Sequence, residues 1–391
     1  MLNYAAHPIS RVRRKLTVRL WLAIAVLLGG LAWNGGCATN STSSTDSLST
    51  GASAKPSGLI YVVNEDEDTV STIDAASQKV IATFKVGQFP HQVAASPDGK
   101  RVYVTGGESS DISIIDVATT KILGTIPGGG DPQGIVVAPD GRYAYVANYD
   151  TNDVSIIDLA TNKVVETVKV GAAPQGITIS ADGKRLYVVN LRSNDVSVID
   201  TATRRVETSI AAGTGPAGIG ISPDGKYLYV GGHGQMGGMP AGGMPGNAGG
   251  MMGATPPPGG SMGGTGNMDP GGKNMDIRII DLATRQVAAT VTCGTMPIVV
   301  SPSTDGKYVY VVSHGSNEVS VVDTASRKVI VKIGVGKNPA GIALSADGRL
   351  AYVTNKDDNN VSVIDLSANK VVANIPVGKG PHGIAYVGTR P

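Results

Sequence analysis

The side chains best suited to chemistry in this sequence are histidines, and two of them share one repeated position. His91 and His382 each follow a proline that recurs along the chain, and equivalent positions hold Gln133 and Gln175. An imidazole serves near neutral pH as a general base, a hydrogen-bond partner or a metal ligand. These histidines are therefore candidates for base or metal chemistry. The alternative, which we favour, is that they are surface side chains without a ligand.

A second pair, His233 and His314, lies four residues after a recurring tyrosine, beside a segment rich in methionine. Eight of the ten methionines occur from Met236 to Met275, among Gly and Pro with almost no charge. Thioethers are soft ligands that suit Cu(I), so this segment and the two imidazoles form a candidate copper site. A low-complexity insertion with an adaptable surface is the alternative that we prefer. The candidate thioether ligands are Met236, Met239, Met244, Met251 and Met252.

Several classes of function find no support in the sequence. The 31 acidic and 33 basic side chains nearly cancel, so there is no electrostatic footprint for nucleic acid. We find no nucleophile elbow, phosphate loop, haem-attachment motif or cysteine-based zinc spacing. Acidic residues at 65–68 and 357–358 supply oxygens suited to Ca²⁺, but their spacing is not that of an EF-hand. Solvated turns are the simpler explanation for them.

A repeat of 42 residues organises the chain. Aspartates that follow Ile or Val recur with gaps of 42, 42, 42, 81, 42 and 42, and the gap of 81 is one period plus 39 inserted residues. Recurring prolines and tyrosines show the same gaps, so three markers agree on seven units. The aspartates are Asp74, Asp116, Asp158, Asp200, Asp281, Asp323 and Asp365.

Each unit predicts four short antiparallel strands. In the fourth unit they cover residues 176–180, 185–190, 196–200 and 205–210, separated by Asp-Gly and Asp-x-Ala-Thr turns. Four strands per period of about 40 residues are typical of a propeller blade.

The two ends of the repeat region complement each other. The first unit begins at Gly58 without an inner strand, whereas residues 381–386 form an inner strand without a blade. We therefore predict an all-β fold over residues 58–391, a seven-bladed β-propeller whose C-terminal strand pairs with the N-terminal blade. The methionine-rich stretch, residues 233–275, is expected to be a disordered insertion in blade five.

The repeated sequence resembles the YVTN β-propeller family. The resemblance rests on Tyr61-Val62-Val63-Asn64, on Tyr352-Val353-Thr354-Asn355, and on the Pro-Asp-Gly turns and Val-Ser-Ile-Ile-Asp strands. That family comprises exported proteins and is similar in architecture to propellers of nitrous oxide reductase, an amine dehydrogenase and a lactonase family. The resemblance implies a fold and a compartment but no single activity. A lactonase-like hydrolase with His91 and His382 at the central channel is one alternative function.

The N-terminus predicts export. Five basic residues precede an uncharged apolar run from Leu20 to Trp33, which is typical of a signal peptide. Cys37 follows small residues, as at the lipidation site of a bacterial lipoprotein, although Asn34 departs from that motif. We expect residues 1–36 to be removed and residues 37–57 to form a flexible tether. The protein would then lie in the periplasm or on the cell surface, and only a lipid on Cys37 would hold it to a membrane.

The seven units also differ in an informative way. Turns after the first and third strands are nearly uniform, whereas the loops after the second strand and between blades vary. Antiparallel geometry places both variable sets on one rim, with the four histidines. We therefore expect a non-catalytic binding or scaffold module that meets a protein or glycan partner on this rim. No cofactor is certain, and copper is the one that the sequence suggests.

Overall fold

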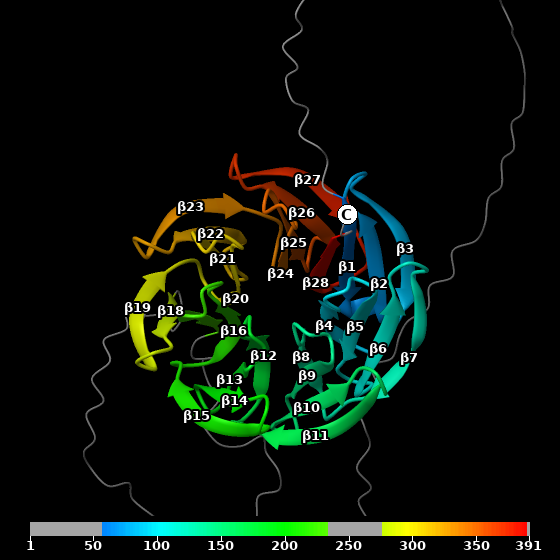
Figure 1. Cartoon of the computed structure of the whole chain (residues 1–391). Coiled ribbons are helices and arrows are strands. Elements are labelled where there is room, and N and C mark those ends of the chain that lie inside the picture. Colours follow the sequence, from blue (N-terminus) through cyan, green and yellow to red (C-terminus); the bar gives the residue numbers. More distant parts are fainter. Residues whose placement is uncertain (1–56, 234–275, 389–391) are drawn as a thin grey trace, which may run out of the picture. The chain divides into compact units, whose positions relative to one another are not determined.

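A computed structural model describes residues 57–233 and 276–388, which form seven four-stranded antiparallel sheets around a central axis. Figure 1 shows the sheets as blades of a closed ring, with the first strand of each blade nearest the axis. The predicted seven-bladed β-propeller is confirmed. One short 3-10 helix, η1 (Glu65–Glu67), accompanies the strands, and no helix in the described ranges is long and apolar enough to span a membrane.

The blades have the following strands, each given from the axis outward. Blade one holds β28 (Pro381–Gly388), β1 (Gly58–Asn64), β2 (Thr69–Asp74) and β3 (Lys79–Lys85). Blade two holds β4 (Pro90–Ala95), β5 (Arg101–Gly106), β6 (Asp111–Asp116) and β7 (Lys121–Pro127). Blade three holds β8 (Pro132–Val137), β9 (Tyr143–Asn148), β10 (Asp153–Asp158) and β11 (Lys163–Lys169).

The remaining four blades are built in the same way, and the insertion falls within blade five. Blade four holds β12 (Pro174–Ile179), β13 (Arg185–Asn190), β14 (Asp195–Asp200) and β15 (Arg205–Ala211). Blade five holds β16 (Pro216–Ile221), β17 (Tyr227–Gly232), β18 (Asp276–Asp281) and β19 (Gln286–Thr292). Blade six holds β20 (Pro297–Pro302), β21 (Tyr308–Ser313), β22 (Glu318–Asp323) and β23 (Lys328–Gly334). Blade seven holds β24 (Pro339–Leu344), β25 (Leu350–Asn355), β26 (Asn360–Asp365) and β27 (Lys370–Pro376).

The ring closes through β28, the last strand of the chain, which pairs antiparallel with β1, the first. Tyr61 of β1 lies opposite Ala385, and Leu59 lies opposite Val387. The last strand of the chain therefore supplies the inner strand of blade one, as the sequence predicts. This pairing removes two exposed sheet edges, which are otherwise sites of aggregation.

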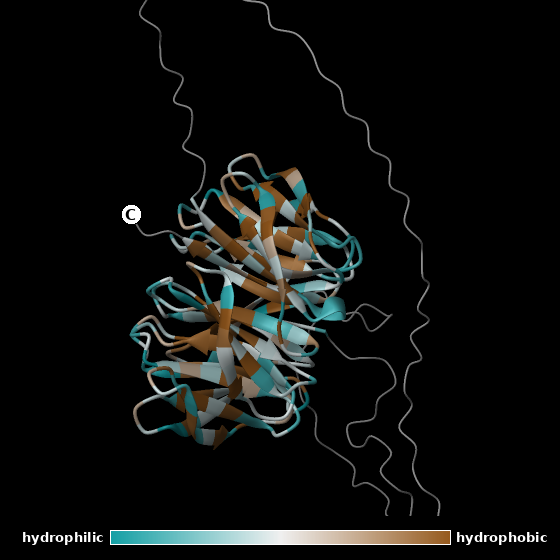
Figure 2. Cartoon of the chain, turned by 90° about the vertical axis from the view of Figure 1, so that its right-hand side faces the viewer, coloured by the Kyte–Doolittle hydropathy of each residue, from teal (hydrophilic) through white to brown (hydrophobic). Residues whose placement is uncertain are grey.

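The core lies between neighbouring blades because the middle strands bury both faces. Val154, Ser155, Ile156 and Ile157 of β10 are all buried, which explains the run of β-branched residues in each third strand. The outermost strands bury one side only, so Ile81 and Val372 are exposed. Figure 2 shows this arrangement, with hydrophobic strands inside the blades and hydrophilic loops at their ends.

Two polar contacts recur and fix the loops. The Asp200 carboxylate accepts hydrogen bonds from the Thr203 amide (2.6 Å) and hydroxyl (2.8 Å), which closes the hairpin between the third and fourth strands. Inside four blades, an asparagine that ends the second strand donates to a serine on the third strand, as Asn148 does to Ser155 at 2.8 Å. A buried amide thus finds its partner within its own sheet.

Close approach of the inner strands explains a repeated glycine. In Pro-x-Gly at the start of the first strand, a Cβ on Gly176 would lie 2.4 Å from the carbonyl oxygen of Ala217 in the next blade. A Cβ on Gly383 would lie 2.5 Å from the carbonyl oxygen of His91. The glycines therefore let adjacent inner strands meet around the channel.

Several sequence-based predictions lie outside the described residues. They are the signal peptide at 1–36, the tether at 37–57 with Cys37, and the methionine-rich insertion. The insertion's position is nevertheless clear, since residues 234–275 connect β17 to β18, the second and third strands of blade five. Cys293 is buried in the core between blades five and six.

Candidate ligand-binding site at the channel mouth

The predicted channel residues meet around one cavity. His382, His91, Gln133 and Gln175 are the second residues of the inner strands β28, β4, β8 and β12. Because these strands begin at the same end of the ring, the four side chains line a cavity of about 530 Å³ together. This volume lies in the range of roughly 300–1,000 Å³ that holds small ligands and cofactors.

The imidazole of His382 is held in one orientation. Its Nδ1 lies 3.0 Å from the backbone carbonyl oxygen of His91, which only accepts hydrogen bonds, so Nδ1 carries the proton. Thr354 of β25 donates to the His382 carbonyl oxygen at 2.7 Å and fixes the strand itself. No described residue makes a hydrogen bond to Nε2, which therefore keeps a lone pair at the cavity. Burial lowers the pKa of His382, so the ring is neutral at pH 7.

His91 is held differently, between two carboxylates. Its Nδ1 lies 3.4 Å from Oε1 of Glu65, and its Nε2 lies 3.4 Å from Oδ1 of Asp131. The rings of His91 and His382 meet edge-on, with centroids 5.9 Å apart. Both nitrogens of His91 thus lie against carboxylate oxygens and not against the open cavity. His91 is therefore a positioning residue, and the predicted lactonase base is reduced to His382 alone.

Glu65 and Asp131 are functional candidates that sequence analysis does not identify. Glu65 is 3% exposed and pairs with Lys356 as well as His91. The hydrogen bond from His91 lowers the pKa of Asp131 more than burial raises it, and Gln133 also donates to Asp131 at 2.8 Å. Asp131 therefore stays charged at pH 7, and the two carboxylates flank His91. One clue exists in the sequence, because Asp131 precedes a repeating proline where no other unit has a carboxylate.

The cavity has a polar mouth and an apolar wall. The apolar side chains come from the inner strands and face the axis below the histidines. They include Ile135, Ile177, Ile219, Val299 and Val300. Tyr149, in the loop after β9, lies at the rim with the guanidinium of Arg192 5.3 Å from its ring centroid. The lining contains no arginine or lysine.

His233 and His314 lie in equivalent loops of blades five and six, but their surroundings differ. His233 lines the channel cavity, and its Nδ1 is buried without a hydrogen-bond partner among the described residues. His314 places its Nδ1 3.2 Å from the carbonyl oxygen of Pro339 in blade seven. Burial, and secondarily the nearby His314, lowers the pKa of His233. The copper hypothesis stays a prediction, because the methionines that it needs lie outside the described residues.

The acidic residues considered for Ca²⁺ are used by the loops themselves. Asp68 accepts the Phe89 amide at 3.0 Å, and Asp358 accepts the Lys337 amide at 2.9 Å. Over residues 57–233 and 276–388, no group of three or more His, Cys, Asp or Glu side chains has the geometry of a metal site. These carboxylates serve chiefly as caps for the connections between blades.

Fold and site together define a propeller protein with a ligand-sized cavity at the mouth of its channel. The model of the Cytochrome D1 heme domain family matches residues 54–170, 104–218 and 272–385. The chain therefore belongs to the Cytochrome D1 heme domain family. No curated protein sequence matches the chain.

Solved structures show the same architecture. One is a hydrazine synthase of Kuenenia stuttgartiensis, at 23% identity and a TM-score of 0.61 over 76% of this chain and 89% of that one. A functionally unknown protein from Desulfotomaculum acetoxidans has a TM-score of 0.66 and 17% identity, and the match covers 85% of this chain and 100% of that one. The dihydro-heme d1 dehydrogenase NirN, solved in complex with DHE, has a TM-score of 0.59 and 16% identity, and the match covers 85% of this chain and 75% of that one. At these identities the likeness shows the fold alone. The expected YVTN assignment is thus confirmed only as far as the propeller architecture.

Proposed function

We propose that the protein is an exported binding module that takes a haem-type tetrapyrrole at the channel mouth, with His382 Nε2 as the ligand to its iron. One observation carries the proposal. His382 is neutral, its Nδ1–H is held by the His91 carbonyl, and its Nε2 faces the cavity. Histidines that bind metals almost always donate their other ring N–H to a carbonyl or carboxylate in this manner.

The cavity offers a nitrogen ligand for the iron, enough volume for the ring and an apolar wall against which the ring can pack. A single imidazole is the usual proximal ligand of haem iron. The cavity of about 530 Å³ and its wall of Ile and Val side chains suit a flat apolar ring. Because the lining has no Arg or Lys, acidic groups of the ring would face solvent at the mouth. Iron bound there supplies redox or ligand-binding chemistry, while the chain's residues bind and orient it.

Family membership supports the choice of a haem-type ligand, and the N-terminal sequence supports export. Members of the family are defined by a domain for a haem, although the NirN and hydrazine synthase structures are too distant to transfer an activity. The basic segment and the apolar run up to Trp33 support export. We assign the protein the role of a carrier or sensor of the group. His91 lies between two carboxylates, and the Nδ1 atom of His233, the third imidazole of the cavity, has no hydrogen-bond partner among the described residues that would orient it as a base.

Absorbance spectroscopy tests the proposal directly. The exported protein is titrated with iron protoporphyrin IX, oxidised and reduced, and compared with His382→Ala and with His314→Ala. We expect saturable binding of one haem with a shifted Soret band. The band should move in His382→Ala, by loss of the nitrogen ligand, and stay unchanged in His314→Ala. Absence of saturable binding, or a His382→Ala spectrum equal to that of the original protein, would disprove it.

A further inference from the structure

A groove between blades four and five differs from its neighbours on the rim opposite the channel mouth. In the adjacent grooves, an arginine in the hairpin after the third strand lies over a tyrosine that begins the second strand of the preceding blade. Arg204 lies 5.4 Å from the ring centroid of Tyr143, and Arg327 lies 5.5 Å from that of Tyr227. These cation–π contacts occupy both guanidinium groups, and a cavity of about 260 Å³ lies beside Arg327 and Tyr227 between blades five and six.

Between blades four and five, the aromatic partner is replaced by a second cation. Arg285 stands at the hairpin position of Arg204, with a similar positive φ of 59°. Arg185, which begins β13, stands where Tyr143 lies in blade three. The Nε atom of Arg185 donates to Oε2 of Glu207 at 3.1 Å. Two guanidinium groups therefore share one groove, and neither stacks on a ring there.

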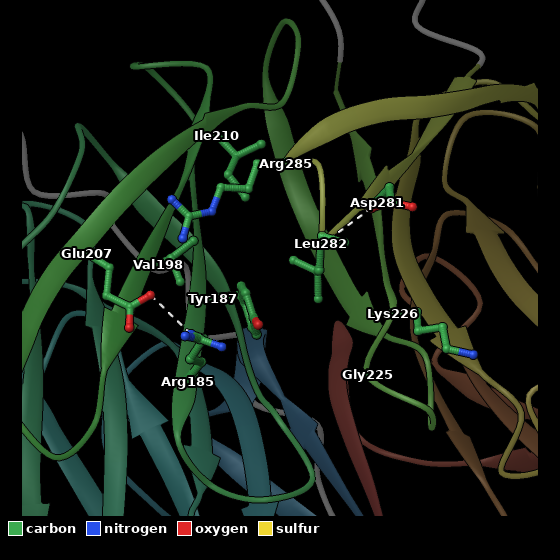
Figure 3. Close-up of a pocket in the computed structure, with 11 residues that line it drawn as sticks. Arg185, Tyr187, Val198, Glu207, Ile210, Gly225, Lys226, Asp281, Leu282 and Arg285 are labelled. Atoms are coloured by element: carbon green, nitrogen blue, oxygen red, sulfur yellow. Dashed lines mark hydrogen bonds and ion pairs between the residues drawn. The ribbon is translucent and has the colours of Figure 1, made fainter.

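The groove holds a cavity of about 320 Å³, which both arginines line. Figure 3 shows the side chains of Arg285, Arg185 and Glu207 reaching from two blades into the same space. The cavity also has an apolar surface, supplied by Tyr187, Val198, Ile210 and Leu282. It can therefore hold both a charged group and a small apolar body.

The charges around the cavity are not balanced. Glu207 is paired with Arg185. Nζ of Lys226 lies 3.2 Å from Oδ2 of Asp224, a carboxylate that is not part of the cavity lining. The carboxylate of Asp281 accepts the amides of Ala283 and Thr284, both at 2.9 Å, and is committed to its own turn. Among the described residues, none gives the guanidinium of Arg285 a hydrogen-bonding carboxylate.

We propose that this groove binds the carboxylate or phosphate group of a small organic anion, held by Arg285 together with the terminal nitrogens of Arg185. A guanidinium presents paired N–H donors that match a carboxylate or phosphate, and two such groups give a charge-assisted clamp. The apolar body of the ligand packs on Tyr187 and Leu282. This site is independent of the channel mouth, and it lies on the rim whose turns look purely structural in the sequence.

Calorimetric titration with two anions of the same apolar body tests the site. The probes are benzoate and phenyl phosphate, with benzyl alcohol as the neutral control. We expect one or both anions to bind and the alcohol not to bind. Arg285→Gln should weaken binding by roughly tenfold or more, since it removes the charged donor. Arg327→Gln, the matched change in the neighbouring groove, should leave binding unchanged. The stronger anion identifies the charged group that the site prefers.

A second variant separates loss of the site from loss of folding. Arg185→Tyr restores the aromatic platform found in blades three and five, so Arg285 should stack on it and one of the two cations of the site is removed. We expect this variant to lose anion binding while its melting temperature stays equal or rises. Absence of binding of either anion to the original protein would overturn the proposal. Binding that survives Arg285→Gln or Arg185→Tyr, or that benzyl alcohol reproduces, would also overturn it.

Discussion

Nδ1 of His382 lies 3.0 Å from the carbonyl oxygen of His91, although 291 positions separate these residues along the chain. The contact joins β28, the strand that closes the ring, to the first strand of the next blade. It also sets the direction of the imidazole whose Nε2 faces the channel cavity. Ring closure and site geometry are therefore parts of one arrangement, and a change that loosens β28 should disturb both.

Loss of a buried side chain on the closing strand should destabilise the whole ring. Ile384 of β28 is 7% exposed and packs with Ile60 and Val62 of β1. Ile384→Ala removes that packing and should lower the free energy of unfolding by about 2–4 kcal/mol, measured by urea denaturation. Val372→Ala, on an outer strand and 55% exposed, is the control and should change it by less than about 0.5 kcal/mol. If both substitutions lowered the free energy of unfolding equally, the packing of β28 would not stabilise the closed ring.

Removal of the buried carboxylate beside His91 should also be costly. Glu65→Gln takes a charge away from Lys356 and from the Nδ1 side of His91. We expect a loss of about 1–2 kcal/mol in unfolding free energy, because the partly buried ammonium of Lys356 loses its charged partner. Glu67→Gln breaks an exposed contact with Lys379 at 3.9 Å and should cost less than about 0.5 kcal/mol. If both substitutions are equally mild, Glu65 is not a structural anchor of the site.

Acid should weaken the fold partly through Asp131. The hydrogen bond from His91 holds the pKa of Asp131 below its ordinary value. The unfolded chain therefore binds the proton more readily. Stability from this group is fully present above the unfolded pKa, about 4, and is lost as pH falls from there through the lower pKa of the folded state. Asp131→Asn should make the fall in unfolding free energy between pH 6 and pH 3 smaller. His91→Gln should have a similar effect, and the double variant little more. Additive effects would show that the two side chains act separately.

The ring is predictable from sequence because the evidence for it is local and repeated. Aspartate, proline and tyrosine markers count the units, and alternating turns divide each unit into four strands. The position of His91 and His382 beside the axis follows from their place after the repeating proline. Gln133 and Gln175 follow by the same logic, and all four meet in one cavity.

The chemistry of that cavity is less predictable because it depends on side chains from different blades. Glu65 belongs to an acidic stretch, and nothing in that stretch distinguishes its buried carboxylate from those of its exposed neighbours. Its partners lie 26 and 291 residues away, His91 on strand β4 and Lys356 in the loop after β25, and packing between blades decides the contacts. The replacement of a tyrosine by Arg185 is visible in the repeat, but its effect on Arg285 requires the groove geometry.

The thiol of Cys293 should be inert while the protein is folded. Burial raises its pKa to about 12, and the thiolate is the reactive form. Iodoacetamide at pH 8 should leave the Cys293 peptide unmodified in the native protein and modify it fully in urea, as followed by peptide mass spectrometry. Rapid labelling without urea would show that blade five opens locally.

Gly383 is the position where packing between blades and site geometry can be tested together. A Cβ there would lie 2.5 Å from the His91 carbonyl oxygen, the acceptor of the His382 hydrogen bond. Gly383→Ala must therefore push β28 away from β4, at a cost of about 1–3 kcal/mol. Gly334 of β23 is the matched control, because a Cβ on it meets nothing within 4 Å, and Gly334→Ala should be nearly neutral. We expect Gly383→Ala also to weaken haem binding, because the imidazole loses its orientation. A variant that unfolds more easily yet binds haem with an unchanged spectrum would separate His382 from the strand contact that holds it.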